Sequence, residues 1–139
     1  MSTKKFSKLQ RVQNTLARVI LRRWKFNNIT PFLMELRWLP VLQRVHFRLA
    51  TVTFNTIHTE EPEYLYDLLK LHVPVRTLPS SNCRILSSSR TPTVIASRAF
   101  KHLSVFIWNN LPADIRNCDS LYTFRRRLKT FMFNSVFAT

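Results

Sequence analysis

The sequence contains no glycine among its 139 residues. Glycine is the residue that most readily adopts a positive φ angle, which helix ends and tight turns often require. We therefore expect asparagine and aspartate at such positions, because both tolerate the left-handed region. The absence also excludes a glycine-rich phosphate-binding loop. The candidate turn residues are Asn27, Asn28, Asn82, Asn109, Asn110 and Asn117.

Acidic residues are scarce, with 7 Asp and Glu against 22 Lys and Arg, so the net charge is +15. An imbalance of this size repels itself and predicts a polyanionic partner. We expect nucleic acid, ahead of an anionic membrane surface or a protein that is merely basic and soluble. Only Cys83 and Cys118 carry thiols, so no disulfide framework is predicted. With no secretory signal, we expect an intracellular protein, nuclear or cytoplasmic, rather than a secreted one.

Clustered catalytic or metal-binding residues are also missing. Two-metal phosphoryl transfer needs carboxylates that hold ions about 4 Å apart, and Asp114 and Asp119 stand singly. The histidines and cysteines lack the spacing of a zinc site. We therefore expect no enzyme activity, no cofactor, no metal and no small-molecule substrate. No apolar run is long enough to span a bilayer, and we expect no membrane partner.

Apolar residues recur at helical spacing along most of the chain. They predict a mostly α fold, a single small domain of residues 1–139 with five to six helices. The stretch Ile29–Phe47 carries Pro31 and Pro40 where helices can begin, with Thr30 as an N-cap, and its bulk predicts a packing nucleus. A helix over Thr3–Trp24 is expected to carry the apolar stripe Phe6, Leu9, Val12, Leu16, Val19 and Ile20.

Further helices are expected over Val41–His58, after Pro62, over Ser97–Asn109 and after the N-cap Ser120. Between them, residues 73–96 are rich in proline and serine and predict an internal loop or linker with one short strand or hairpin. Trp38 and Trp108 are expected in the core. The buried side of the helix over Val41–His58 is expected at Val41, Val45, Leu49, Val52 and Ile57, with Leu42 and Phe54 adjoining.

Basic residues gather near both ends of the chain and form the candidate nucleic-acid site. No acid precedes Glu35. The first helix can therefore lie on a phosphate backbone; a mitochondrial transit peptide and an ordinary helix with a solvated basic face are the alternatives. Trp24 is the aromatic side chain nominated to stack on single-stranded bases. The predicted non-specific phosphate contacts are Lys4, Lys5, Lys8, Arg11, Arg22, Arg23 and Lys25 from one end, and Arg125, Arg126, Arg127 and Lys129 from the other.

Six segments follow the order and spacing of six motifs in a known family: LQRVQNTLARV (Leu9–Val19), ITPFLMELRWLPVLQRVHF (Ile29–Phe47), PEYLYDLL (Pro62–Leu69), RAF (Arg98–Phe100), WNNLPADIR (Trp108–Arg116) and SLYTFRRRLKTFMF (Ser120–Phe133). Together they resemble the C-terminal region of the polyprotein of non-LTR retrotransposons, in the Jockey-like branch of long interspersed elements. The family often has glycine where Arg22, Thr59 and Ala96 stand here, and a lost glycine strains any turn that needs positive φ.

In that family the full protein carries an endonuclease domain and then a reverse transcriptase, and the matched region follows the catalytic palm. The resemblance implies a position near template RNA and target DNA. It does not imply polymerase activity, because this chain has no Asp-Asp pair. We therefore predict a basic, non-catalytic RNA- or DNA-binding helical module, a remnant or derivative of such an element. The alternatives are a helical interaction module that packs on the reverse transcriptase core, and a truncated element copy with no function of its own.

Overall fold

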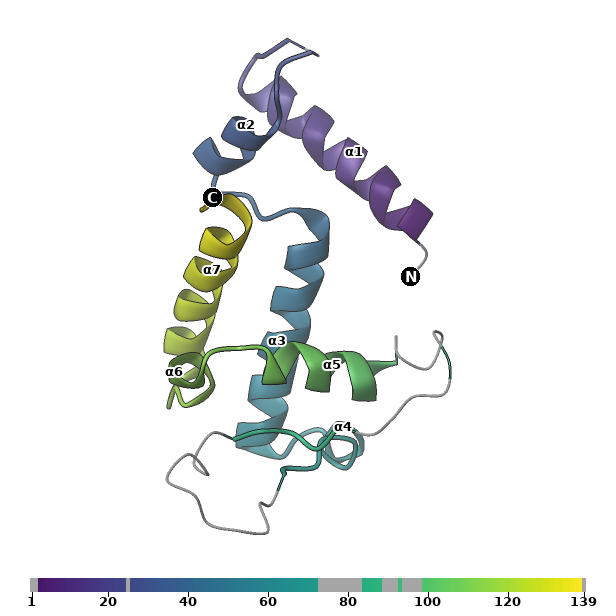
Figure 1. Ribbon diagram of the computed structural model, residues 1–139, viewed down its shortest axis with the longest axis vertical. Helices are drawn as coiled ribbons and strands as arrows, with labels where there is room; N and C mark the ends of the chain where they lie inside the picture. The colour runs from purple at the N-terminus through teal and green to yellow at the C-terminus, as the bar shows by residue number, and fades with distance from the viewer. Residues whose placement is uncertain (1–2, 25, 73–83, 89–92, 94–98, 139) are drawn as a thin grey trace. The chain divides into compact units, whose positions relative to one another are not determined.

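The computed structural model describes residues 3–24, 26–72, 84–88, 93 and 99–138 (Figure 1). The fold is mostly α, as predicted. The described residues contain α1 (Thr3–Ile20), α2 (Thr30–Glu35), α3 (Val41–Thr59), α4 (Glu63–Tyr66), α5 (Phe100–Asn109), α6 (Ala113–Arg116) and α7 (Leu121–Phe137). The helix expected after Pro62 is present as the single turn α4, and the one helix beyond the predicted five to six is α6, a single turn too short to show a helical repeat in the sequence.

The chain divides into two compact units. Unit 1 comprises Met1–Phe47 and Lys129–Thr139, and unit 2 comprises Arg48–Leu128. The division falls inside α3 and inside α7, so each of these helices contributes residues to both units. The single-domain organisation expected from the sequence stays a prediction.

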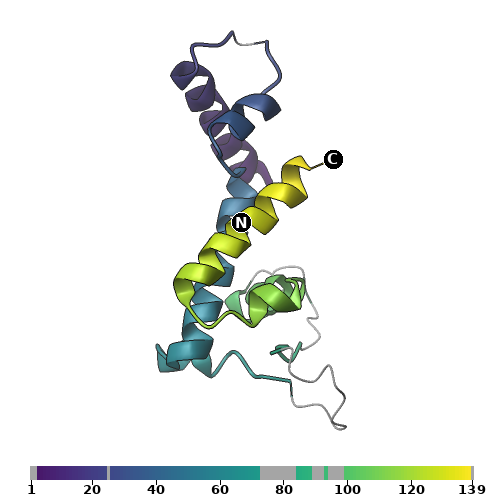
Figure 2. The same cartoon turned by 90° about the vertical axis from the view of Figure 1, so that its left-hand side faces the viewer.

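In unit 1, α1 packs against α2 and against the corner at Pro40, and two glutamines make the attachment (Figures 1 and 2). The buried Gln13 donates from Nε2 to the carbonyl oxygen of Leu39 at 2.8 Å. The Oε1 atom of Gln10 accepts the N–H of Val41 at 2.9 Å. The N–H of Val41 lies in the first turn of α3, where it has no partner within the helix. Amide side chains of α1 therefore bond the backbone on both sides of Pro40.

The apolar stripe predicted on the first helix is not its buried face. Five of its six members are 47% to 67% exposed, and the inward face carries Gln13 and Ala17 instead. The reason is geometric: positions 13 and 17 are one helical turn apart, and Ala17 allows the close approach that the bonds of Gln13 require. The exposed members are Leu9, Val12, Leu16, Val19 and Ile20.

The first helix ends at Ile20, four residues before the predicted end. Arg22 adopts a φ of 49°. Its N–H donates to the carbonyl of Val19 at 3.2 Å, and the N–H of Arg23 donates to that of Arg18 at 2.9 Å. This pair of bonds is a Schellman motif, in which a left-handed residue closes the helix.

Positive φ angles in the described residues fall at Arg22, Arg37, Glu60 and Arg84. The expectation that asparagine and aspartate would take these positions is wrong for the described part of the chain, and Asn82 lies outside it. Arg22, Arg37 and Glu60 follow the last residues of α1, α2 and α3. Packing determines where each helix ends, and the residue just after that end adopts the positive φ angle whatever its type.

The N-caps agree with the sequence at one of two predicted sites. Ser120 caps α7, since its Oγ accepts the N–H of Thr123 at 3.2 Å. Thr30 is not a cap: the N-cap of α2 is Ile29, which makes no capping side-chain bond, and Asn28 Oδ1 accepts the N–H of Thr30 at 3.2 Å. Asn28 stands two residues before Thr30, so its side chain can accept the N–H of Thr30 in an Asx-type turn.

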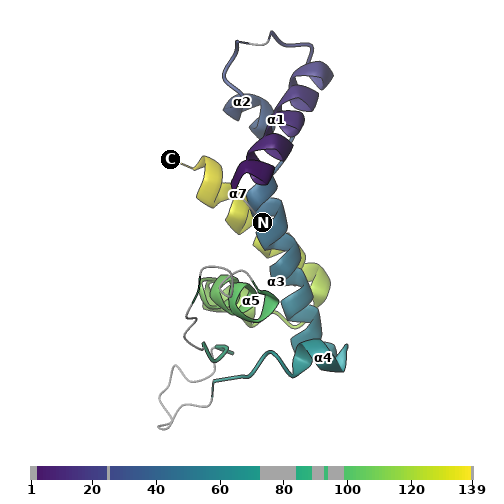
Figure 3. The same cartoon turned by 90° about the vertical axis from the view of Figure 1, so that its right-hand side faces the viewer.

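In unit 2, aromatic side chains from α3, α5 and α7 form the core. The ring of Phe54 stacks on Phe124 with centroids 4.2 Å apart, and Trp108 lies 5.9 Å from Phe124. Helix α5 lies beside α3 in Figures 1 and 3, and the ring centroids of Trp108 and Phe54 are 6.4 Å apart. Trp108 is fully buried, as predicted, whereas Trp38 of unit 1 is only half-buried.

The buried side of α3 differs from the predicted one. Its fully buried residues are Ala50, Thr53, Phe54 and Thr56, whereas Val52 is exposed. Small and threonine side chains allow neighbouring elements to approach closely, and Thr53 satisfies its hydroxyl on the carbonyl of Leu49 at 2.9 Å. Tertiary packing therefore decides which side of α3 is buried, and it leaves the apolar side chain of Val52 exposed.

A short segment, residues 84–88, is held beside the end of α5. Leu86 forms an isolated antiparallel bridge with Leu71. The side chain of Asn109 accepts the N–H of Leu86 and donates to its carbonyl, both at 2.9 Å, and Trp108 Nε1 donates to the carbonyl of Arg84 at 2.7 Å. Of the strand predicted near 73–96, the described residues contain this bridge; residues 73–83, 89–92 and 94–98 lie outside them.

Candidate nucleic-acid interface

Four of the predicted phosphate contacts project from α1. Lys4, Lys8 and Arg11 are spaced by four and three residues, so they share one face of the helix. Lys5 is displaced from them around the helix, toward the exposed apolar stripe. All four side chains are exposed, and no hydrogen bond or ion pair joins them to another described residue. We call Lys4, Lys8 and Arg11 the basic row.

Arg22 and Arg23 lie just beyond the other end of α1, and both are exposed. At 1.5 Å per residue, α1 separates Lys4 from Ile20 by roughly 24 Å. The predicted contacts of α1 and the residues that follow it are therefore spread along the helix and do not form a single anion pocket, which suits a backbone of successive phosphates. Lys25, which the sequence also nominated, lies outside the described residues.

The second predicted cluster lies on α7, where Arg125, Arg126, Arg127 and Lys129 are all exposed. Arg125 and Lys129 are one turn apart and share a face. Arg127 is engaged within the chain, because its Nη1 donates to the carbonyl of Asp114 at 3.1 Å and lies 3.9 Å from Cys118 Sγ. Arg126 also has a partner within the chain. Arg125 and Lys129 are therefore the cations of this run best placed to meet a ligand.

The structure assigns the two clusters to different parts of the chain. The α1 residues belong to unit 1, whereas Arg125, Arg126 and Arg127 belong to unit 2. Lys129 belongs to unit 1 but continues the same helix. Each cluster is therefore tested by its own variants.

One exposed aromatic residue was not nominated from the sequence. Phe26 is 90% exposed in the loop between α1 and α2, close in sequence to Trp24, which is 80% exposed. The available signal was an aromatic residue placed among basic and amide side chains, with no helical repeat to bury it. Arg84 belongs to the basic segment that the sequence predicted to be a loop, and its Nη1 lies 2.7 Å from Nε2 of His58.

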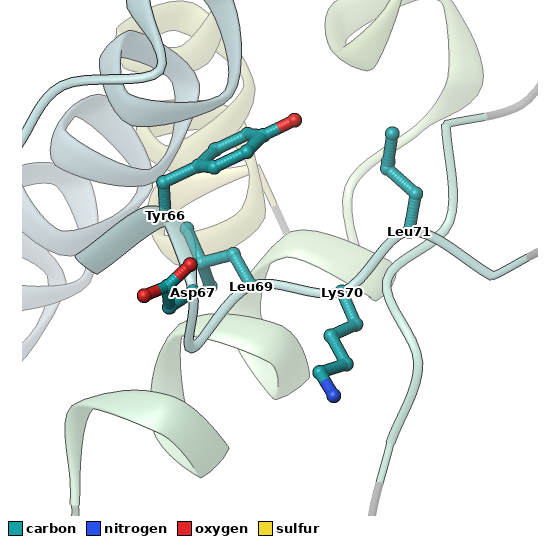
Figure 4. A pocket seen from close by; sticks show the side chains of 5 residues that line it. All are labelled: Tyr66, Asp67, Leu69, Lys70 and Leu71. Carbon is teal, nitrogen blue, oxygen red and sulfur yellow. The ribbon is translucent and has the colours of Figure 1, made fainter. Parts of the chain in front are cut away.

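Residues 66–71 line an open depression of about 330 Å³, whose walls are Tyr66, Asp67, Leu69, Lys70 and Leu71 (Figure 4). Figure 4 shows the Asp67 carboxylate and the Lys70 amine pointing in different directions. Among the described residues that line it, Asp67 supplies the one carboxylate and Lys70 the one amine.

Two negative findings apply to the described ranges alone. They contain no cluster of three His, Cys, Asp or Glu side chains able to hold a metal ion. Nor do they contain a helix with the length and apolar character needed to traverse a bilayer. One histidine departs from its ordinary behaviour: burial lowers the pKa of His46 on α3.

Comparisons of the chain with protein-family models, with curated proteins and with solved structures found no match.

Proposed function

We propose that the protein binds the phosphate backbone of RNA or DNA without sequence specificity, as a non-catalytic helical module related to the C-terminal region of retrotransposon reverse transcriptases. The observation that carries the proposal is the basic row, Lys4, Lys8 and Arg11, exposed along one face of a helix in a segment free of acids. The resemblance to Jockey-like elements supports the same partner.

The row favours a backbone ligand because of its geometry. Its spacing places the three cations along the axis of α1 over roughly 11 Å at 1.5 Å per residue, a length that spans more than one phosphate. Lysine and arginine on a helix face neutralise phosphates and release counterions, which sets affinity without reading bases. Arg22 and Arg23 follow α1 in the sequence.

Salt titration of RNA binding tests the proposal. Binding should weaken steeply with salt, by about 0.7 to 0.9 in the log–log slope for each phosphate contact. Replacing Lys4, Lys8 and Arg11 together by glutamine should reduce that slope by about two to three. A flat salt response, or no binding near physiological salt, would contradict the proposal.

A matched control separates a site from net charge. Arg37, Arg44 and Arg48 are exposed and lie outside the basic row and the α7 cluster, so their replacement by glutamine also removes three charges. This variant should keep most of the affinity and slope. Equal losses in both triple variants would mean that charge alone, and not the basic row, accounts for binding. Arg125→Gln with Lys129→Gln tests the α7 surface in the same assay.

A second candidate function follows from the exposed stripe, Leu9, Val12, Leu16, Val19 and Ile20. A contiguous exposed apolar surface on a soluble fold marks an interaction site, and phosphate neutralisation makes no use of it. The occupant that the resemblance suggests is the core of a reverse transcriptase of the same family.

The stripe is tested by Leu9→Gln with Leu16→Gln. If it docks on such a core, this variant should bind the core at least tenfold more weakly, aggregate less and retain its thermal transition. Tyr122→Gln, at another exposed site, is the control. A wild-type chain that unfolds sharply, stays monomeric and does not bind the reverse transcriptase core would count against docking.

A further inference from the structure

The loop between α1 and α2 presents two aromatic rings to solvent. Trp24 is 80% exposed and Phe26 is 90% exposed, whereas the same chain buries Trp108 completely. Large aromatic side chains contribute strongly to stability when buried, so two rings left in water on one loop contribute little to the fold. They are available to a ligand.

Hydrogen bonds join the described residues of this loop on both sides of position 25. The Schellman motif at Arg22 and Arg23 fixes its start. The N–H of Asn27 donates to the carbonyl of Trp24 at 3.3 Å, and Arg18 Nη2 donates to the carbonyl of Asn27 at 3.4 Å. The bond from Thr30 N–H to Asn28 Oδ1 joins its end to α2. A loop held in this way loses little conformational entropy when its rings meet a ligand.

Cations are next to the rings in the sequence. Arg22 and Arg23 precede Trp24 and are exposed, with no side-chain partner among the described residues. No acidic residue occurs before Glu35. Aromatic faces next to positive charges match a strand whose bases are unpaired, because bases then stack on the rings while phosphates meet the cations. A duplex keeps its base faces stacked inside the helix and offers only the phosphates.

We propose that residues 21–24 and 26–29 form a base-stacking site for single-stranded nucleic acid. Trp24 and Phe26 stack on bases, and Arg22 and Arg23 hold the flanking phosphates. This inference rests on the proposed function, to which it adds a preference for single strands. Lys25 lies outside the described residues and has no part in it.

The test compares three probes with the full chain at one salt concentration: an oligothymidine of about 12 nucleotides, its abasic counterpart with the same phosphates, and a duplex of equal length. Stacking contributes about 1 to 3 kcal/mol per base. The oligothymidine should therefore bind at least fivefold more tightly than the abasic strand. Trp24→Ala and Phe26→Ala should each remove most of that difference and leave the salt slope unchanged.

Two variants act as controls. Tyr122→Ala removes an aromatic ring that is 76% exposed on α7 and should change nothing. Trp24→Tyr keeps a stacking face and should restore most of the base-dependent affinity. All these side chains are exposed, and unchanged thermal unfolding will show that the variants fold.

The outcomes separate this inference from the function on which it rests. No binding to any probe would overturn the proposed function itself. Equal binding to normal and abasic strands would leave backbone binding standing and overturn the stacking site. A third outcome combines nucleic-acid binding that does not depend on the bases with binding to phosphatidylserine vesicles that does depend on the two rings. It would assign the rings to a lipid surface and would also overturn the stacking site.

Discussion

Arginine and glutamate close helices here in positions that glycine usually takes. At Arg37, with a φ of 51°, the N–H bonds to the carbonyl of Met34 at 3.0 Å and the N–H of Trp38 bonds to that of Leu33 at 2.8 Å. Glu60 makes the simpler single bond to the carbonyl of Thr56 at 3.0 Å. These bonds satisfy carbonyls that helix ends leave unpaired, but each Cβ remains crowded in the left-handed region.

Arg37→Gly should stabilise the chain by about 1 kcal/mol, because a left-handed non-glycine residue costs about 1 to 2 kcal/mol and part of the gain is lost to the entropy of glycine in the unfolded chain. Urea denaturation measures the change. Asn117→Gly is the control, because Asn117 has a φ of −90° and relieves no strain. A lower free energy of unfolding for Arg37→Gly than for wild type would disprove strain at this residue.

Asn109 is a structural residue whose side chain completes the bonding of residues 84–88. Asn109→Ala leaves the N–H and carbonyl of the buried Leu86 without these partners, so it should cost about 2 to 3 kcal/mol of stability. Its neighbour Asn110 is exposed and donates to the carbonyl of Phe106 at 2.9 Å. Asn110→Ala should cost about 1 kcal/mol or less. Equal losses of thermal stability in the two variants would show that the hydrogen bonds of Asn109 to Leu86 contribute no more than the bond of Asn110 to Phe106.

At the scale of a single helix, α1 attaches to the chain through polar side chains and exposes apolar ones, which is the reverse of the usual pattern. Its attached face carries the amides of Gln10 and Gln13, and its apolar stripe faces solvent. Leu16→Ala should therefore cost less than about 1 kcal/mol, whereas Gln13→Ala should cost about 1 to 3 kcal/mol because the buried carbonyl of Leu39 loses its donor. Denaturation of both variants measures this order. A larger loss for Leu16→Ala would mean that the stripe is packed in solution.

Helix α3 gives the chain a pH dependence through His46. Burial lowers the pKa of this imidazole below its ordinary value of 6.5, so the unfolded chain binds the proton more readily. Stability should be full above pH 6.5 and should fall as pH drops through the range between that value and the lowered pKa. His46→Gln should flatten this part of the profile in thermal unfolding. An unchanged slope in His46→Gln would contradict the assignment.

At the scale of the whole molecule, charge is unevenly divided. Unit 1 holds 11 basic residues and 1 acidic residue, a net charge of +10, whereas unit 2 holds 11 and 6, a net charge of +5. The six acidic residues of unit 2 therefore balance over half of its cations, and unit 1 has almost no internal compensation. This asymmetry makes unit 1 the stronger electrostatic attractor for a polyanion.

Salt should consequently have opposite effects on folding and on binding. Without nucleic acid, raising the salt concentration from about 0.05 to 0.5 M should raise the melting temperature, because shorter screening lengths weaken self-repulsion. Over the same range, affinity for RNA should fall. Calorimetry of the free chain measures the first effect. A melting temperature that falls with added salt would mean that attractive ion pairs, and not repulsion, dominate the free protein.

The sequence predicted the features that depend on neighbouring residues. The span of α3, the cap at Ser120 and the burial of Trp108 follow from local repeat, side-chain chemistry and size. The inward face of α1 did not follow, because it depends on where the backbone of Leu39 and Val41 presents its polar groups. The positive φ angles were also missed, because they depend on where packing stops each helix.

The residues of the candidate site also divide into those that the sequence predicted and those that depend on the fold. Exposure of the basic row was predictable, because its spacing and composition are local. The engagement of Arg127 by the carbonyl of Asp114 and the exposure of Phe26 were not, since both depend on contacts made or missed in the fold. Whether these residues bind nucleic acid stays a prediction until the salt and abasic-strand experiments are made.

The aromatic core of unit 2 has a consequence for how the chain folds. Phe54, Trp108 and Phe124 meet although 70 residues separate the first from the last. Bringing such distant rings together requires closure of a long loop before any contact is gained, which slows folding. During synthesis, the stacking partner of Phe54 on α7 is therefore made 70 residues after Phe54 itself. The nascent chain spends that interval open to chaperones, and a chain cut short before α7 would never complete this core.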